Sequence, residues 1–473
     1  MHHFPRRDRN EDREAINRFE RRSDNPSDAY FDVHQIEIIH DYYIETGNFE
    51  RALEAIEIGL NQHPMATSLM LRKATLLMDS ARFDEAKTIL LLLSKIESND
   101  PDVFLHLGSL YLYQSNLEEG LQYLKRAHFL GIDQGEEFED LVLDICNQLN
   151  FYGYYEETIK YIKSLDAQFR SHKAVLFEFG VASENLFDFE KALESYKALI
   201  EQDPFLENVW YNIGNTLNKD NRFDEAIDAY LYSLAINPIN VEAMFNLGSC
   251  YAQIGDFETA LDYYLEHASF LPFAEPVYPY IADCFEQLEN YTQAYKYFNL
   301  MVTLNELNSE GYVGMGNCLY EMGDYKGALK NFKSAHEISP ESSDITFSIG
   351  KCYFSLKKNP TAIKFFKKTI LLNEHDTAAW LELYFLRHEI SEKDLEKLFS
   401  KIDLFENENF SLYYLSVIIW MERGELENAL NALKKGVYMR PEDLRILLEY
   451  YPEIMNEPLL ADFINEISDN DEL

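Results

Sequence analysis

Basic residues are scarce in this sequence. Lys and Arg number 42 against 82 Asp and Glu, which gives a formal net charge of −40 at pH 7. A field of that sign repels phosphate groups, so it disfavours nucleic-acid ligands and anionic membrane surfaces. It favours basic protein partners, because opposite charges speed their encounter. Plain solubility is the alternative explanation of the same charge.

Long apolar runs are also missing. No stretch approaches the roughly 18–20 apolar residues of a membrane-spanning helix, and residues 1–27 hold no apolar leader of the signal-peptide type. The last four residues, 470–473, are similar to an endoplasmic-reticulum retrieval signal, but Asn470 stands where such signals carry Lys or His. The sequence therefore predicts a cytoplasmic protein.

What the chain does contain is a repeat of 34 residues. Small residues recur at this step at Gly214, Gly248, Ala282, Gly316 and Gly350. A fixed period in this range predicts a solenoid, in which each unit packs only on its neighbours. Within one period, apolar residues at spacings of three and four form one face of each of two helices, separated by a polar break. Each repeat is therefore expected to be a helical hairpin.

The details of the repeat resemble the tetratricopeptide repeat (TPR) family. One period places Met244, Leu247, Gly248, Tyr251, Gly255, Asp256, Phe257, Ala260, Tyr264 and Pro272 in the positions of the family pattern. The resemblance implies an all-α, right-handed TPR superhelix of antiparallel hairpins. About twelve units are counted, with starts near Val33, Thr67, Pro101, Glu139, Lys173, Glu207, Val241, Glu275, Ser309, Ser343, Thr377 and Phe410.

Breaks in the register divide the chain. Residues 1–28 are highly charged and Arg-rich, and are expected to be a disordered or loosely helical tail. Units 1–3 occupy 29–134 and units 4–10 occupy 135–376, because the third and fourth starts are 38 residues apart. Residues 377–473 hold a degenerate unit 11, whose second half is 391–409, then unit 12 and C-terminal capping helices.

No catalytic, metal or cofactor site is predicted. The run Gly311, Gly314 and Gly316 resembles a phosphate loop in spelling, but no strand precedes it. Cys250, Cys284, Cys318 and Cys352 also stand 34 residues apart. Equivalent positions on stacked helices are about 8–10 Å apart, too far for a disulfide or a shared metal ion. We expect these cysteines to be small buried residues, and the protein not to be an enzyme.

A binding site is expected instead on the concave groove, which in the TPR family is lined by the first helix of each hairpin. The candidate peptide-binding residues are Phe177, Tyr211, Asn212, Asn215, Phe245, Asn246, Asn317, Tyr320, Phe347 and Phe354. An apolar row of this kind can seat an extended peptide or an amphipathic helix, and amides can pair with a peptide backbone. The alternative is that the apolar row packs between helices.

The co-chaperone type of TPR, which holds a carboxylate with Asn, Lys and Arg side chains, is disfavoured. Its basic positions hold Tyr211, Pro276 and Tyr280 here. The resemblance thus implies a non-enzymatic scaffold that binds basic or amphipathic protein segments in an acidic, partly apolar groove. Two alternatives stay open: a self-associating subunit of a homo-oligomeric assembly, and a regulatory subunit that acts on an enzyme in trans.

Overall fold

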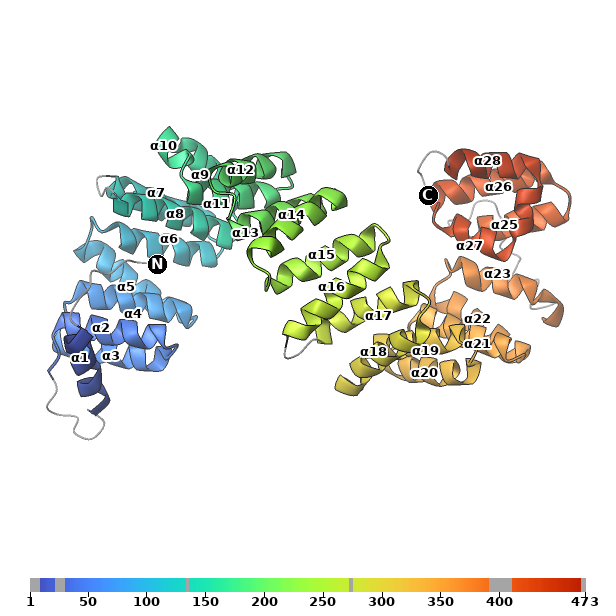
Figure 1. Cartoon of the computed structure of the whole chain (residues 1–473), viewed down its shortest axis with the longest axis horizontal. Coiled ribbons are helices and arrows are strands. Elements are labelled where there is room, and N and C mark those ends of the chain that lie inside the picture. Colours follow the sequence, from blue (N-terminus) through green and yellow to red (C-terminus); the bar gives the residue numbers. More distant parts are fainter. Residues whose placement is uncertain (1–8, 22–29, 133–135, 272–274, 391–410, 469–473) are drawn as a thin grey trace. The chain divides into compact units, whose positions relative to one another are not determined.

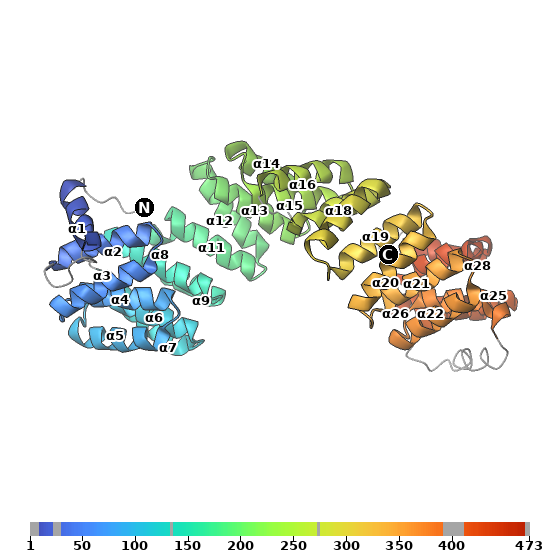
Figure 2. The ribbon, with the colours of Figure 1, turned by 90° about the horizontal axis from the view of Figure 1, so that it is seen from below.

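The computed structural model describes residues 9–21, 30–132, 136–271, 275–390 and 411–468. All regular elements in these ranges are helices, and none of those helices is long and apolar enough to cross a bilayer. The helices belong to two compact units, residues 1–237 and 238–473, called here the N-terminal and the C-terminal unit. Within each unit consecutive hairpins stack side by side (Figure 1, Figure 2).

The N-terminal unit contains helices α1 to α14. Their bounds are α1 Arg9–Arg21, α2 Val33–Glu45, α3 Phe49–Gln62, α4 Thr67–Asp79, α5 Phe83–Ile96, α6 Pro101–Tyr113, α7 Leu117–Gly131, α8 Glu136–Phe151, α9 Tyr155–Ser164, α10 Ala167–Arg170, α11 Lys173–Asn185, α12 Phe189–Gln202, α13 Glu207–Lys219 and α14 Phe223–Ile236.

The C-terminal unit continues the same alternation of first and second helices. Its elements are α15 Val241–Gln253, α16 Phe257–Phe270, η2 Glu275–Val277, α17 Tyr278–Gln287, α18 Tyr291–Leu304, α19 Ser309–Glu321, α20 Tyr325–Ile338, α21 Ser343–Ser355, α22 Asn359–Leu372, α23 Thr377–Phe385, η3 Arg387–Glu389, α25 Ser411–Glu422, α26 Leu426–Met439, α27 Asp443–Tyr450, η4 Pro452–Asn456 and α28 Pro458–Ser468.

The all-α repeat fold predicted from the 34-residue period is confirmed. Ten of the predicted starts coincide with the first residue of a helix, at Val33, Thr67, Pro101, Lys173, Glu207, Val241, Glu275, Ser309, Ser343 and Thr377. The predicted fourth start, Glu139, is three residues after the first residue of α8, Glu136. Phe410 and the second half of unit 11 lie outside the described residues, as does the 470–473 motif. The predicted divisions after residues 134 and 376 stay predictions.

Close packing within each hairpin explains the small-residue position. A Cβ added to Gly214 would lie 2.6 Å from the Tyr230 ring, and one added to Gly350 would lie 2.6 Å from the Phe366 ring. Tyr230 and Phe366 are fully buried aromatic side chains of the second helix. The first helices of these two hairpins therefore need glycine where they cross the ring.

The turn between the two helices of a hairpin repeats one backbone conformation. The residue at this turn has positive φ at Gly47, Ala81, Ser115, Gly153, Phe187, Asn221, Gly255, Glu289, Gly323, Lys357 and Gly424. Glycine adopts this left-handed region without strain, whereas the Cβ of the other residues disfavours it. Six of the eleven turns hold that conformation without glycine, so the turn is imposed by the packing of the hairpin.

Both ends of the described chain are covered by extra helices. Residues 9–21 of the Arg-rich segment take the helical alternative, since α1 packs on α2 with Ala15 and Phe19 buried. The Arg18 guanidinium donates to the Tyr30 carbonyl at 2.8 Å. At the other end, α27 and α28 bury Leu447 and Leu460 in one core with α25 and α26. A solenoid needs such covering because a terminal repeat has one bare apolar face.

Candidate functional site

The predicted apolar row is half-buried, which lies between the two alternatives that the sequence left open. In the N-terminal unit, the Phe177 and Tyr211 rings lie 6.1 and 6.0 Å from the buried tyrosines of their own hairpins. In the C-terminal unit, Phe245 packs 5.5 Å from Tyr264, and Phe347 packs 5.5 Å from Phe366. Each ring thus uses one face for packing and leaves part of its surface accessible.

The predicted amides differ in their surroundings. Asn215 accepts a hydrogen bond from the Tyr230 hydroxyl at 2.8 Å, so its side chain helps to hold the hairpin. Asn212 and Asn246 are half-buried on α13 and α15, whereas Asn317 on α19 is exposed. Asn317 is therefore the predicted amide most accessible to a ligand.

The two remaining predicted aromatic residues, Tyr320 and Phe354, lie near lysines. The Tyr320 hydroxyl is 2.9 Å from the Ser355 hydroxyl, and Lys351 Nζ lies 5.3 Å from the Tyr320 ring. Lys357 Nζ lies 6.0 Å from the ring of the half-buried Phe354. These contacts make the surface around α21 less acidic than the groove that the sequence predicted.

One hollow of about 520 Å³ brings part of the predicted groove together in the C-terminal unit. It is called here the C-terminal hollow, and it is lined by Pro276, Pro279, Tyr280, Asp283, Glu286, Phe298, Glu310, Val313, Gly314 and Asn317. Most of these residues come from α17 and α19, the first helices of two consecutive hairpins. Of the ten predicted site residues, only Asn317 lines it.

The charge of the C-terminal hollow is entirely negative. Asp283, Glu286 and Glu310 line it, and none of its lining residues is Lys or Arg. Burial raises the pKa of Glu286, and the neighbouring Asp283 carboxylate raises it further, while the Cys318 thiol, which donates at 3.5 Å, opposes this shift. Such a concentration of one sign of charge in a concave site attracts cations.

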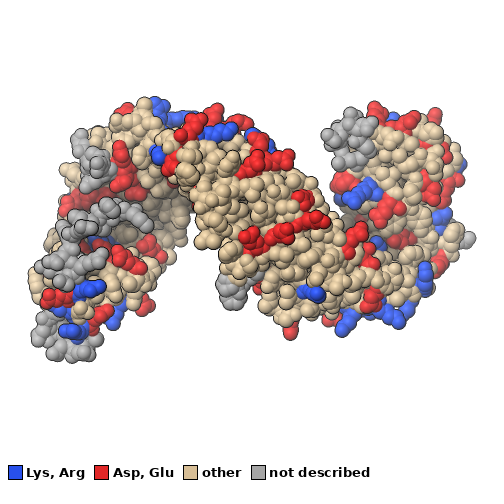
Figure 3. All heavy atoms as spheres, in the orientation of Figure 1, with Lys and Arg blue, Asp and Glu red and all other residues tan. Residues whose placement is uncertain are grey.

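Acidic and basic side chains are unevenly distributed over the C-terminal unit. Asp and Glu form a band on the displayed face over α15 to α17, whereas Lys and Arg gather over α20 to α22 (Figure 3). Acidic charge is therefore not spread evenly along this unit.

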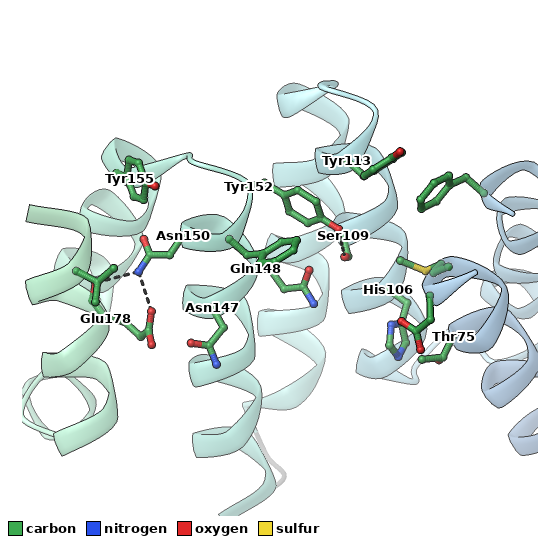
Figure 4. Close-up of a pocket in the computed structure, with 15 residues that line it drawn as sticks. Thr75, His106, Ser109, Tyr113, Asn147, Gln148, Asn150, Tyr152, Tyr155 and Glu178 are labelled. Atoms are coloured by element: carbon green, nitrogen blue, oxygen red, sulfur yellow. Dashed lines mark hydrogen bonds between the residues drawn. The ribbon is translucent and has the colours of Figure 1, made fainter. Parts of the chain in front are cut away.

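The N-terminal unit holds a second and larger concavity of about 800 Å³, which the sequence did not predict. It is called here the N-terminal pocket. First helices α4, α6, α8 and α11 contribute most of its lining, from Thr75 on α4 to Glu178 and Val181 on α11 (Figure 4). Thr75, Ser109, Asn147 and Val181 occupy equivalent positions of four repeats, but the 38-residue step hides this register between Ser109 and Asn147.

Polar groups cluster at the α8 and α11 end of the N-terminal pocket. The Asn150 amide donates to Glu178 Oε2 at 2.8 Å and to the Glu178 carbonyl at 3.0 Å (Figure 4). With its amide nitrogen toward α11, Asn147 donates to Glu178 Oε1 at 2.7 Å. Burial raises the pKa of Glu178, and the Asn150 hydrogen bond opposes this shift.

The other end of the N-terminal pocket is uncharged at neutral pH apart from the exposed Asp79. His106 lies there beside Thr75 (Figure 4), and burial lowers the pKa of His106 to about 4. The Tyr152 hydroxyl lies 3.2 Å from that of Ser109. Tyr113 stacks on Phe83 with ring centroids 3.8 Å apart.

The cysteines are packing residues in the structure. All five are buried and none forms a disulfide within the described residues, and burial raises the pKa of Cys250 and Cys284 to about 11. Among the described residues, no group of three or more His, Cys, Asp or Glu is arranged to hold a metal ion. A thiol that stays protonated near pH 7 is a poor nucleophile and a poor metal ligand.

The glycines of the motif that resembles a phosphate-binding loop also allow close helix packing. A Cβ added to Gly314 would lie 2.4 Å from the Phe298 ring, and one added to Gly316 would lie 2.6 Å from the Phe332 ring. Helix α19 is thus held between α18 and α20 by glycines on two of its sides. This accounts for the motif without a phosphate ligand.

Comparison with known proteins identifies the repeats. Family models described as tetratricopeptide repeat match residues 184–238, 211–275 and 319–384. No curated protein matches the chain.

Solved structures of similar proteins include the TPR protein YrrB, whose title describes an unusual peptide-binding site, at 21% identity and a TM-score of 0.35, covering 39% of this chain and 95% of that one. A TPR protein from Parabacteroides merdae is 20% identical with a TM-score of 0.42, covering 59% of this chain and 98% of that one. The C-terminal part of a TPR protein from Cytophaga hutchinsonii is 16% identical with a TM-score of 0.44, covering 52% and 98%. At these identities and TM-scores the likeness gives no information on function.

Proposed function

This chain is a tetratricopeptide-repeat protein, and on that premise we propose that it is a non-enzymatic scaffold that binds basic or amphipathic segments of partner proteins. The observation that carries the proposal is the C-terminal hollow, where three carboxylates meet without a basic residue in the lining. Pro279, Tyr280 and Val313 give the same surface an apolar part. A segment with Lys or Arg beside apolar side chains complements both features.

The shape of the C-terminal hollow favours an extended segment. Its lining runs from η2 and α17 to α19, so a bound chain would contact two consecutive repeats. The exposed Asn317 amide can both donate to and accept from a peptide backbone at one side of the hollow. Asp283, Glu286 and Glu310 would then select cationic side chains along the segment.

The test is affinity capture from native lysate with two variants of equal charge. The hollow variant carries Asp283→Asn, Glu286→Gln and Glu310→Gln. The control variant carries Glu258→Gln, Asp262→Asn and Glu266→Gln, three exposed positions on the second helix α16. Both variants lose three negative charges. A difference between them in partner capture therefore depends on where the carboxylates lie and not on the net charge of the chain.

We expect the wild type and the control variant to retain the same partner, and the hollow variant to lose it. Each variant must keep the wild-type circular dichroism spectrum and elute as the wild type does in size exclusion. Retention of the partner by all three proteins would reject the C-terminal hollow as its binding site. A mass in light scattering that rises with concentration would instead favour the self-associating alternative.

A further inference from the structure

Glu178 in the N-terminal pocket is a half-buried carboxylate with no counter-ion among the residues that the structure describes. Its polar neighbours are the Asn147 and Asn150 amides, and none of the residues lining the pocket is Lys or Arg. Transfer of a carboxylate away from water is costly unless a cation or several donors compensate it. Two neutral amides supply only part of that compensation, so the site is suited to receive a cation.

Asn150 provides a second indication that the pocket has room for a hydrogen-bonding ligand. Its side chain is 8% exposed, and its nitrogen is used twice on Glu178. Its oxygen Oδ1 has no hydrogen-bond partner among the residues that the structure describes. A buried acceptor without a donor is uncommon in folded proteins. The pocket therefore holds a fixed carboxylate and, beside it, an acceptor that a donor-rich ligand could satisfy after a small adjustment of Asn150.

The walls of the same pocket are aromatic. Phe151 ends α8, Tyr152 lies in the turn after it and Tyr155 begins α9. Phe151 is 83% exposed. Aromatic faces attract cations, and a planar guanidinium also stacks on them. The neutral His106 adds no repulsion at the opposite end.

We propose that the N-terminal pocket binds an arginine side chain, with the guanidinium on the Glu178 carboxylate and against the aromatic rings of the α8 and α9 end. The guanidinium carries five N–H donors in a planar fork, which suits a carboxylate held by amides better than the compact ammonium of lysine does. The exposed Asp79 carboxylate on α4 would attract a second basic residue of the bound segment at the other end of the pocket. The inference rests on the proposed function in that the arginine belongs to a partner protein, but it concerns a different concavity.

The experiment compares three short peptides on the full-length chain by isothermal titration calorimetry at low salt. They are acetyl-Leu-Arg-Leu-amide, the same peptide with lysine, and the same peptide with citrulline, the neutral isostere of arginine. We expect the arginine peptide to bind tightest and the citrulline peptide to bind at least about tenfold more weakly, because charge-assisted hydrogen bonds are lost. When Glu178→Gln is added to the hollow variant, in which the C-terminal hollow has lost its three charges, the arginine and citrulline peptides should bind alike.

Two further variants make the result unambiguous. The hollow variant, with Asp283→Asn, Glu286→Gln and Glu310→Gln, removes the charge of the C-terminal hollow and should keep the discrimination between arginine and citrulline. Phe151→Ala removes an exposed ring, and should weaken arginine binding without affecting the fold. Equal binding of arginine and citrulline by the wild type would overturn the proposal, as would discrimination that survives Glu178→Gln in the hollow variant. Loss of the discrimination in the hollow variant alone would also overturn it, while supporting the C-terminal hollow as the basic site.

Discussion

Replacing Gly316 by leucine is expected to lower the free energy of unfolding of the C-terminal unit by about 3 kcal/mol, the upper end of the usual cost of overpacking. Even a Cβ at this position would lie 2.6 Å from Cε1 of Phe332. Phe332 is 2% exposed on α20, so its ring has no free space into which to move. The leucine must therefore separate α19 from α20.

Asn317→Leu is the matched control, because it introduces the same side chain one residue later on an exposed position of α19. Surface substitutions usually change stability by less than about 0.5 kcal/mol. Urea unfolding followed by circular dichroism should show a lower midpoint for Gly316→Leu and an almost unchanged one for Asn317→Leu. Equal midpoints for Gly316→Leu and the wild type would mean that the first and second helices of this hairpin do not pack as closely as described.

Replacing Glu184 by alanine should destabilise the N-terminal unit by about 2 kcal/mol, since a buried polar cluster loses its shared acceptor. Glu184 on α11 is 7% exposed. It accepts from the Thr216 hydroxyl at 3.0 Å, from the Tyr196 hydroxyl at 3.4 Å and from Lys219 Nζ at 2.7 Å. This loss of stability is smaller than that expected for a fully buried ion pair, because the Lys219 side chain is 47% exposed.

Two comparisons separate the contributions to this cluster. Glu194→Ala, on the exposed face of α12, is the control and should leave the unfolding midpoint nearly unchanged. Glu184→Gln keeps the size and an acceptor for the two hydroxyl groups but removes the charge opposite Lys219, so its midpoint should lie between those of Glu184→Ala and the wild type. If Glu184→Ala unfolds at the wild-type midpoint, the cluster contributes nothing to the stacking of α11, α12 and α13.

The fold could be predicted because the residues that pack the two helices of a hairpin recur at fixed positions of the repeat. Gly214 and Gly350 mark the crossing with the second helix, and the buried Tyr230 and Phe366 recur with them at the same step. The turns were harder, because Phe187 and Glu289 hold positive φ where glycine is the expected residue. The packing of α1 through Ala15 and Phe19 was not predicted, since short helices in charged segments give little periodic signal.

The candidate site was predicted less completely. Of the groove residues that the sequence predicted, Asn317 lines the C-terminal hollow. The sequence missed the N-terminal pocket, because the register shifts before α8 and because the link between Asn150 and Glu178 depends on how α8 packs on α11. Periodicity identifies which face a residue occupies, whereas the depth of a pocket and the absence of a counter-ion depend on three-dimensional packing.

The most direct test of the central claim, that this chain binds basic segments in the C-terminal hollow, is selection of a random peptide library on the immobilised full-length protein. The selected peptides should be tested individually on the wild type, on the hollow variant and on the α16 control variant. The account predicts peptides with Lys or Arg next to apolar residues, which bind the wild type and the control variant but not the hollow variant. Selection of acidic or uncharged peptides, or equal binding to all three proteins, would contradict it.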